Sequence, residues 1–139
     1  MYQPGEEGTQ PAQAECILIV DDEPSVLTGM RLTLEYAGFK VNTADGGAAA
    51  LRSLEQEVPA VVVMDWMLPD MECTDALNEI RRHWGEVPVI VYTGCAEDQV
   101  MRRARESLGF TLLTKPSPGQ ELSGAVRGLM KEHQVSCRK

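Results

Sequence analysis

The sequence has few basic residues, no long apolar run and no leader-like N-terminus. Its 13 Lys and Arg residues are outnumbered by 21 Asp and Glu residues, which gives a formal net charge of −8. This balance disfavours direct binding to nucleic acid or to an anionic membrane, because both depend on neutralising negative charge. No apolar stretch approaches the length of a membrane span, and residues 1–14 lack the basic and apolar regions of a signal peptide. We therefore expect a cytoplasmic protein with neither nucleic acid nor a membrane as its direct partner.

The sequence also lacks paired cysteines and several familiar enzyme motifs. Its four cysteines, Cys16, Cys73, Cys95 and Cys137, form no C-x-x-C motif. Free thiols in a reducing compartment are therefore a simpler interpretation than a disulfide framework or a zinc site. The P-loop, the dinucleotide fingerprint G-x-G-x-x-G and the hydrolase motif G-x-S-x-G are missing as well. Any chemistry must come from another set of side chains.

A short apolar run at residues 61–64 is the most informative stretch that is present. Its valines predict a strand that is buried on both faces, as is typical of a parallel sheet. The run stops at Asp65, and Pro69 then directs the chain into a loop. Asp65 is therefore expected at the carboxyl end of a central strand, which is where open α/β sheets bind ligands.

Strand-like and helical patterns alternate along the rest of the chain. Strands are predicted at residues 16–20, 39–43, 61–64, 87–92 and 110–114. Helices are predicted at residues 24–37, 48–56, 73–84 and 97–108, with a last apolar helix face over residues 122–130. This alternation predicts right-handed βαβ crossovers, and hence a doubly wound (βα)5 sandwich with helices on both faces of a parallel sheet.

The chain is long enough for one domain with a single core. Residues 1–14 are rich in Gln, Gly, Pro and Glu and are predicted to be a disordered N-terminal tail. Residues 15–133 are assigned to the domain, and residues 134–139 to a short C-terminal tail. Because few residues follow Lys131, we expect the output to act through another protein, or the sequence to be one segment of a longer chain.

Polar side chains follow four of the five predicted strands. They are Asp21 and Asp22 after the first strand, Asp65 after the third, Thr93 after the fourth and Lys115 after the fifth. The carboxyl ends of parallel strands meet at one edge, so these groups are expected to converge. Carboxylates that converge repel one another unless a cation neutralises them, and their oxygen atoms suit Mg²⁺. Lys115 and Thr93 suit a phosphoryl group, for which Asp65 is the natural nucleophile.

A sequence with these strand-end residues resembles a known family, the response-regulator receiver domains of two-component signalling. The resemblance covers about residues 14–132 and rests on several motifs that occur in the expected order along the chain. The motifs are Asp21-Asp22, Asp65 followed by Pro69, Thr93, Lys115-Pro116, and the segments Leu34-x-x-x-Gly38 and Ala44 to Leu51. The resemblance implies the flavodoxin-like fold with strand order 2-1-3-4-5.

The resemblance also implies a role for each matching residue. Asp65 would accept a phosphoryl group from the phosphohistidine of a histidine kinase or phosphotransfer protein. Lys115 would pair with the phosphoryl oxygens, and Thr93 would move in to hydrogen-bond them. The lysine would be aimed at the acids by a cis Lys115–Pro116 peptide bond. The protein would then be a signalling switch rather than an enzyme, catalysing only its own phosphorylation and dephosphorylation.

The metal, by the same resemblance, is Mg²⁺. Asp22 and Asp65 would bind it directly together with the backbone carbonyl of Met67, and Asp21 would act mainly through water. The signal would leave through the face formed by the helix at 97–108, the strand at 110–114 and the last helix. An unknown output protein, a fused output domain or a second copy of the chain would bind that face.

The sequence departs from the family pattern at four positions. Cys73 stands where the family has Gly, Gly94 where it has Ala, and Ser117 where it often has Phe. Leu112 takes the place of an aromatic switch residue, so we expect signalling without an aromatic toggle.

Three alternatives remain open at the level of sequence. Asp21 and Asp22 alone would be read as a helix cap, since acids favour helix N-termini. A receiver-like scaffold that works unphosphorylated is a second alternative. A phosphohydrolase with an aspartate nucleophile is a third, although the segment Asp65-Trp66-Met67 lacks the second acid of a D-x-D motif.

Overall fold

The computed structural model describes residues 15–115 and 119–137, in which the strands form one parallel sheet. The strands are β2 (Cys16–Val20), β3 (Lys40–Ala44), β4 (Val61–Met64), β5 (Val89–Thr93) and β6 (Thr111–Thr114). Their order across the sheet is β3-β2-β4-β5-β6, which confirms the predicted order 2-1-3-4-5. The predicted tail at 1–14, the Lys115–Pro116 peptide bond and Ser117 involve positions outside the described residues.

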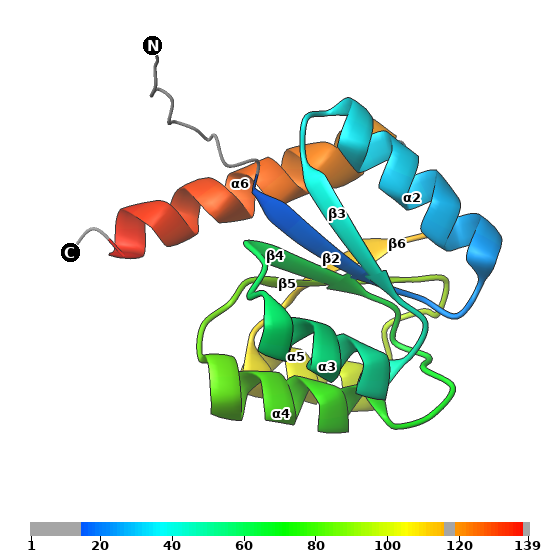
Figure 1. Cartoon of the computed structure of the whole chain (residues 1–139). Helices are drawn as coiled ribbons and strands as arrows, with labels where there is room; N and C mark the ends of the chain where they lie inside the picture. Colours follow the sequence, from blue (N-terminus) through cyan, green and yellow to red (C-terminus); the bar gives the residue numbers. More distant parts are fainter. Residues whose placement is uncertain (1–14, 116–118, 138–139) are drawn as a thin grey trace, which may run out of the picture.

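Helices cover both faces of the sheet, as the alternation predicts (Figure 1). The helices are α2 (Pro24–Tyr36), α3 (Gly47–Gln56), α4 (Cys73–Trp84), α5 (Gln99–Leu108) and α6 (Gly119–Cys137). Helices α2 and α6 lie on one face, and α3, α4 and α5 lie on the other (Figure 1). None of the helices in the described ranges is both long and apolar enough to cross a membrane.

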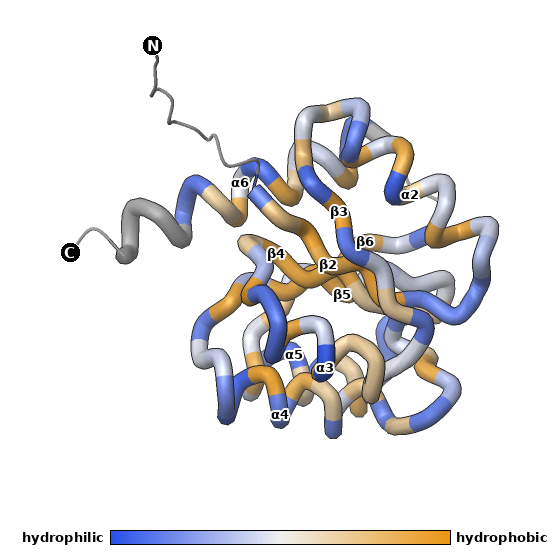
Figure 2. Tube along the Cα trace, in the orientation of Figure 1, coloured by the Kyte–Doolittle hydropathy of each residue, from blue (hydrophilic) through white to orange (hydrophobic). Residues whose placement is uncertain are grey.

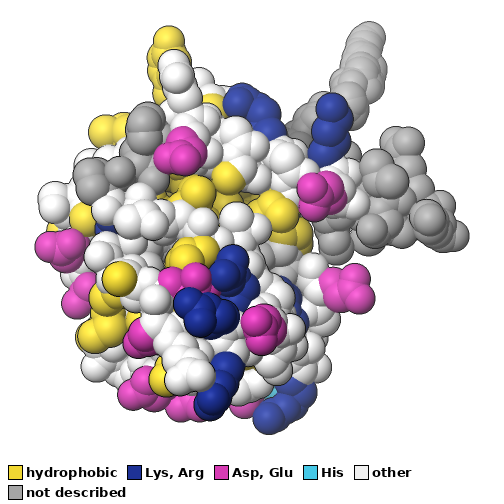
Figure 3. All heavy atoms as spheres, turned by 180° about the vertical axis from the view of Figure 1, so that it is seen from behind, with side chains coloured by type: hydrophobic (Ala, Val, Ile, Leu, Met, Phe, Trp, Pro, Cys, Tyr) yellow, Lys and Arg dark blue, Asp and Glu magenta, His cyan; other side chains and the backbone are white. Residues whose placement is uncertain are grey.

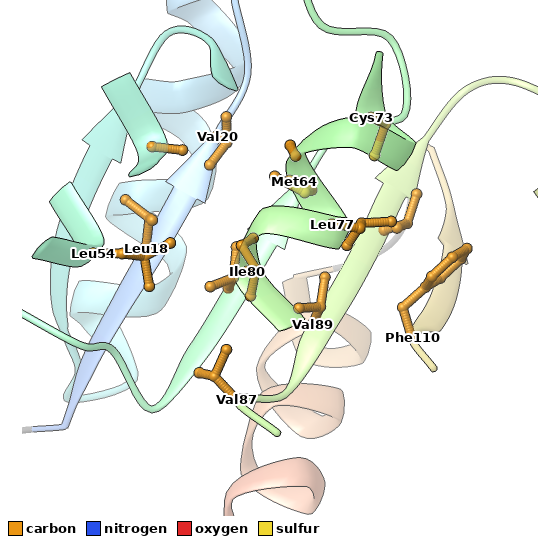
Figure 4. Packing of buried hydrophobic residues seen from close by; sticks show 14 of the residues in the cluster. Leu18, Val20, Leu54, Met64, Cys73, Leu77, Ile80, Val87, Val89 and Phe110 are labelled. Carbon is orange, nitrogen blue, oxygen red and sulfur yellow. The ribbon is translucent and has the colours of Figure 1, made fainter. Parts of the chain in front are cut away.

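The central strands are buried on both faces, so successive side chains fill two separate cores. Ile17, Ile19, Val61 and Val63 pack under α2 and α6. Their neighbours Leu18, Val20, Val62 and Met64 pack under α3, α4 and α5. The central strands are accordingly the most apolar part of the trace (Figure 2), and Figure 4 shows Leu77 and Ile80 of α4 turned towards the sheet. Two apolar faces fix the strand register, which in turn fixes where each strand ends.

Several element ends differ slightly from the sequence prediction, for local reasons. Strand β5 begins at Val89 because Pro88 has no N–H to contribute to the ladder. Helix α5 begins at Gln99 because the Asp98 side chain accepts a hydrogen bond from the Met101 amide at 2.8 Å and caps the helix. Helix α6 runs on to Cys137, through most of the segment 134–139 that the sequence assigned to a tail.

Candidate functional site

Two buried or nearly buried carboxylates meet one lysine at the carboxyl edge of the sheet. The Lys115 Nζ atom lies 2.6 Å from Asp21 Oδ2 and 3.1 Å from Asp65 Oδ2. The exposed fractions of the three side chains are 1% for Asp21, 13% for Asp65 and 17% for Lys115. The lysine, which follows an edge strand, therefore reaches across to the ends of β4 and β2.

The sheet itself positions these three side chains. The Asp65 amide donates to the carbonyl of Val20 at 3.0 Å, and the Lys115 amide donates to the carbonyl of Thr93 at 2.8 Å. These bonds continue the β-ladders one residue beyond the strands, so both side chains project from the rim of the sheet. Asp21 Oδ1 also accepts from the amide of Glu23 at 2.9 Å. Because the N-cap of α2 is Glu23, Asp21 is oriented by the turn before that helix and is not its cap.

The local electrostatics favour a charged lysine. Burial by itself lowers the pKa of Lys115, but the hydrogen bonds and charges of Asp21 and Asp65 outweigh this effect, and the pKa is raised above its ordinary value. The ammonium also lies 5.7 Å from the centroid of the Tyr92 ring. A positive charge is thus held between the two acids, where it can neutralise the charge of an incoming anion.

Thr93 lies at the same edge of the sheet, at the end of β5, but its hydroxyl is directed into the loop that follows. The side chain is 1% exposed, and its Oγ1 accepts from the amide of Cys95 at 3.3 Å. Gly94 and Cys95 are themselves exposed. The hydroxyl accepts this bond through a lone pair, so its O–H is still available to donate to a ligand at the acid cluster.

The remaining predicted metal ligands are less enclosed. Asp22 is exposed, the Met67 side chain is 61% exposed, and the Met67 amide donates to Asp65 Oδ1 at 3.2 Å. Within the described part of the chain, His, Cys, Asp and Glu side chains form no group of three or more that is arranged to hold a metal. Mg²⁺ does not require such a cage, because it keeps several waters and is usually bound through one or two carboxylates. The acids outnumber the lysine here, so the donor set fits a divalent cation.

Two of the departures from the family pattern, Cys73 and Leu112, serve packing. Cys73 is buried at the start of α4, and burial raises the pKa of its thiol to about 12, with smaller contributions from Asp65 and Glu72. Cys16 and Cys73 are buried free thiols and Cys95 is an exposed one, as the sequence predicted for these three. Leu112 packs with the cluster beneath α5, and Trp66 lies against Phe110 with ring centroids 6.3 Å apart.

One residue of this region escaped the sequence prediction. Asp70, in the loop after Asp65, accepts hydrogen bonds from the amides of Gly47 and Ala48 at 2.8 and 3.0 Å. Its partners lie 23 and 22 residues away in the sequence, so no local pattern marks it.

The fold and the strand-end cluster define a class of protein, the response regulators of two-component systems. The model of the response regulator receiver domain matches residues 17–127, which is most of the chain. The chain belongs to this family.

Named relatives and solved structures agree with this assignment. The transcriptional regulatory protein KdpE of Mycobacterium tuberculosis is 33% identical over 121 residues, which cover 87% of this chain and 53% of that protein. The alkaline phosphatase synthesis regulator PhoP of Bacillus subtilis is 29% identical over 121 residues, which cover 87% and 50%. The chain thus spans about half the length of the curated regulators it matches.

The structural matches cover nearly the whole of their counterparts. A receiver domain from Clostridium thermocellum superposes with a TM-score of 0.81 at 28% identity, over 87% of this chain and 98% of that one. A CheY-like receiver from Methanospirillum hungatei superposes with a TM-score of 0.84 at 26% identity, over 88% of this chain and 98% of that one. The flavodoxin-like receiver fold is therefore confirmed.

Proposed function

We propose that this receiver accepts a phosphoryl group on Asp65 from the phosphohistidine of a histidine kinase or phosphotransfer protein. The observation that carries the proposal is the Lys115 ammonium held between Asp21 and Asp65 at the rim of the sheet. An oxygen of the Asp65 carboxylate attacks the phosphorus, the P–N bond to the imidazole breaks, and its electron pair returns to the ring nitrogen. Positioning and charge neutralisation supply most of the catalysis in such transfers.

Two side chains of the site take new partners in this reaction. Lys115 moves its hydrogen bonds from the carboxylates to the new phosphoryl oxygens, which carry more charge. Thr93 gains a partner, because its O–H donates to the same group. Asp22, Asp65 and the Met67 carbonyl would hold Mg²⁺, with Asp21 acting through water; when bound, the ion neutralises charge on the phosphoryl oxygens.

The output surface is the face formed by α5, β6 and α6. Thr93 lies at the end of β5, close before α5, so its movement acts on the loop that leads into that helix. Seen from the β6 side, basic side chains gather on the lower part of the surface, over α5, and an apolar strip separates them from α6 (Figure 3). Phosphorylation would bias a two-state arrangement of this face rather than build a new one.

We propose a signalling role in which this chain contacts proteins and not nucleic acid. Its relatives carry the names of transcriptional regulators and are about twice as long, so a fused or separate output unit is the expected partner. A homodimer through the α5-β6-α6 face is an alternative arrangement for the phosphorylated state.

Acetyl phosphate with Mg²⁺ tests the assignment directly. Wild-type protein should gain one phosphoryl mass, Asp65→Asn should gain none, and the exposed control Asp75→Asn should label like wild type. Undiminished labelling of Asp65→Asn would refute the phosphoacceptor. An unlabelled wild type would favour the scaffold alternative, and steady release of phosphate by wild type would favour the phosphohydrolase.

Trp66 offers a separate test of the metal site. The indole follows Asp65 directly and packs against Phe110, so a divalent ion at the site should alter its fluorescence. Titration of Mg²⁺ should give a smaller response in Asp22→Ala than in wild type. Equal responses would remove Asp22 from the ligand set.

A further inference from the structure

We infer that Asp70 is a positioning residue, whose carboxylate latches the phosphoacceptor loop, residues 65–72, to the N-terminus of helix α3. The inference rests on the proposed function, because it concerns how the loop that carries Asp65 and Met67 is held in place. The Asp70 carboxylate accepts its hydrogen bonds from amides of α3 and not from the proposed site residues, so it acts through the backbone.

The contact fills a gap in the capping of α3. The N-cap of this helix is Gly46, which has no side chain to accept a bond, and the first turn of the helix carries no acid. Asp70 accepts from the Gly47 amide through Oδ1 and from the Ala48 amide through Oδ2. A carboxylate at this end also complements the helix dipole. The hydrogen bond from the Ala48 amide, and after it the one from the Gly47 amide, holds the pKa of Asp70 below its ordinary value. The Asp70 carboxylate is therefore ionised at neutral pH.

The two glycines at the start of α3 make room for the loop. A Cβ atom at Gly46 would lie 2.9 Å from Asp70 Oδ1, and one at Gly47 would lie 2.5 Å from the Cγ and Sδ atoms of Met71. Neither glycine has a positive φ, so the constraint here is close approach and not backbone conformation: a side chain at either position would force the Asp70 carboxylate or the Met71 side chain to shift. The Gly46-Gly47 pair and Asp70 therefore belong to one contact.

This contact bears on the chemistry because the same loop orients the acceptor. The Met67 amide donates to Asp65 Oδ1, and the Met67 carbonyl is a proposed metal ligand. Leu68 and Met71 pack against the core and hold the loop by apolar contact, but neither fixes its direction through hydrogen bonds. Loss of the Asp70 latch should let the loop between Asp65 and α4 sample other positions. Metal affinity should then fall on the order of tenfold, as is typical when groups that orient metal ligands are removed.

The test compares the wild-type chain with Asp70→Ala, Asp70→Asn and the control Asp75→Ala. Asp75 is an exposed acid in the first turn of α4, so its removal changes the charge equally without touching the latch. We measure the Mg²⁺ dependence of labelling by acetyl phosphate, the Mg²⁺ affinity by Trp66 fluorescence, and the urea midpoint of each variant. Amide exchange over residues 65–72 without metal reports the loop independently of any activity.

Asp70→Ala should raise the Mg²⁺ concentration for half-maximal labelling on the order of tenfold and speed exchange in the loop, while the rate at saturating Mg²⁺ falls much less. For Asp70→Asn, both the Mg²⁺ concentration for half-maximal labelling and the exchange rate in the loop should lie between those of Asp70→Ala and wild type, since its single amide oxygen still accepts one hydrogen bond. Gly46→Ala keeps the carboxylate but displaces it, and should shift the Mg²⁺ dependence in the same direction.

The latch is overturned if Asp70→Ala matches Asp75→Ala in Mg²⁺ affinity and in loop exchange, whether or not wild type is labelled. A wild type that binds Mg²⁺ but is not labelled would refute the proposed phosphorylation alone, because fluorescence and exchange still decide the latch. A wild type that binds no Mg²⁺ would refute the positioning role.

Discussion

Arg81 allows a quantitative test of the contacts that stabilise the end of the sheet opposite the candidate site. From α4 its guanidinium donates to the carbonyls of Leu108 and Gly109 at 2.7 Å each, and to those of Val87 and Gly85 at 2.7 and 2.9 Å. One side chain thus joins the C-terminal ends of α4 and α5 and the start of β5. Burial lowers the pKa of Arg81 from its ordinary value, although the group stays charged at neutral pH.

The expected loss in Arg81→Met follows from the burial of its partners. The bonds to Leu108 and Val87 are partly buried, while those to Gly85 and Gly109 are exposed and water can replace them. At about 1.5 kcal/mol for each partly buried bond from a charged donor, the free energy of unfolding should fall by about 3 kcal/mol. With a urea m-value of about 2 kcal/mol/M, the midpoint should drop by about 1.5 M.

The adjacent arginine provides the matched control. Arg82 is 66% exposed and pairs only with Glu79 among the ion pairs of the described residues, at 3.0 Å, so Arg82→Met should cost no more than about 0.5 kcal/mol. Arg81→Lys should lie in between, because an ammonium cannot span all four carbonyls. If Arg81→Met and Arg82→Met have the same midpoint, the four bonds contribute nothing net and the reasoning fails.

The remaining predictions concern the site and the switch. Thr93→Ala should abolish most of the change in amide exchange that beryllofluoride produces across α5 and β6, whereas Leu112→Ala should keep much of it; a wild-type response in Thr93→Ala would contradict a signal that runs from Thr93 through the loop into α5. By the resemblance to receivers, Met67 and Cys95 would border the path of the water that hydrolyses the phosphoryl group, and neither side chain is suited to orient it. We therefore expect Met67→Asn to speed dephosphorylation; an equal or slower decay would count against this. In the native protein iodoacetamide at pH 8 should modify exposed Cys95 and spare Cys73, whose thiol is buried and has a pKa of about 12; comparable labelling by mass spectrometry would show that the start of α4 opens.

Much of the fold was predictable because its signals are local. The valine-rich run before Asp65 marks a doubly buried strand, and the alternation of such runs with helical patterns requires crossovers of one hand. Gly38 and Gly85 have φ angles of 103° and 61° and end α2 and α4 where the sequence predicted. Strand ends, and therefore the positions of Asp21, Asp65 and Lys115, follow from these near-neighbour properties.

Only the tertiary structure decided which of these groups meet. Alternation alone leaves the strand order open, and that order brings Lys115 on an edge strand to acids two and three strands away. The hydrogen bonds between Asp70 and α3, and between Arg81 and the end of α5, join segments more than 20 residues apart. No local pattern predicts either pairing. Such contacts depend on how every face of the sheet is covered at once, which is a property of the packed chain and not of any stretch within it.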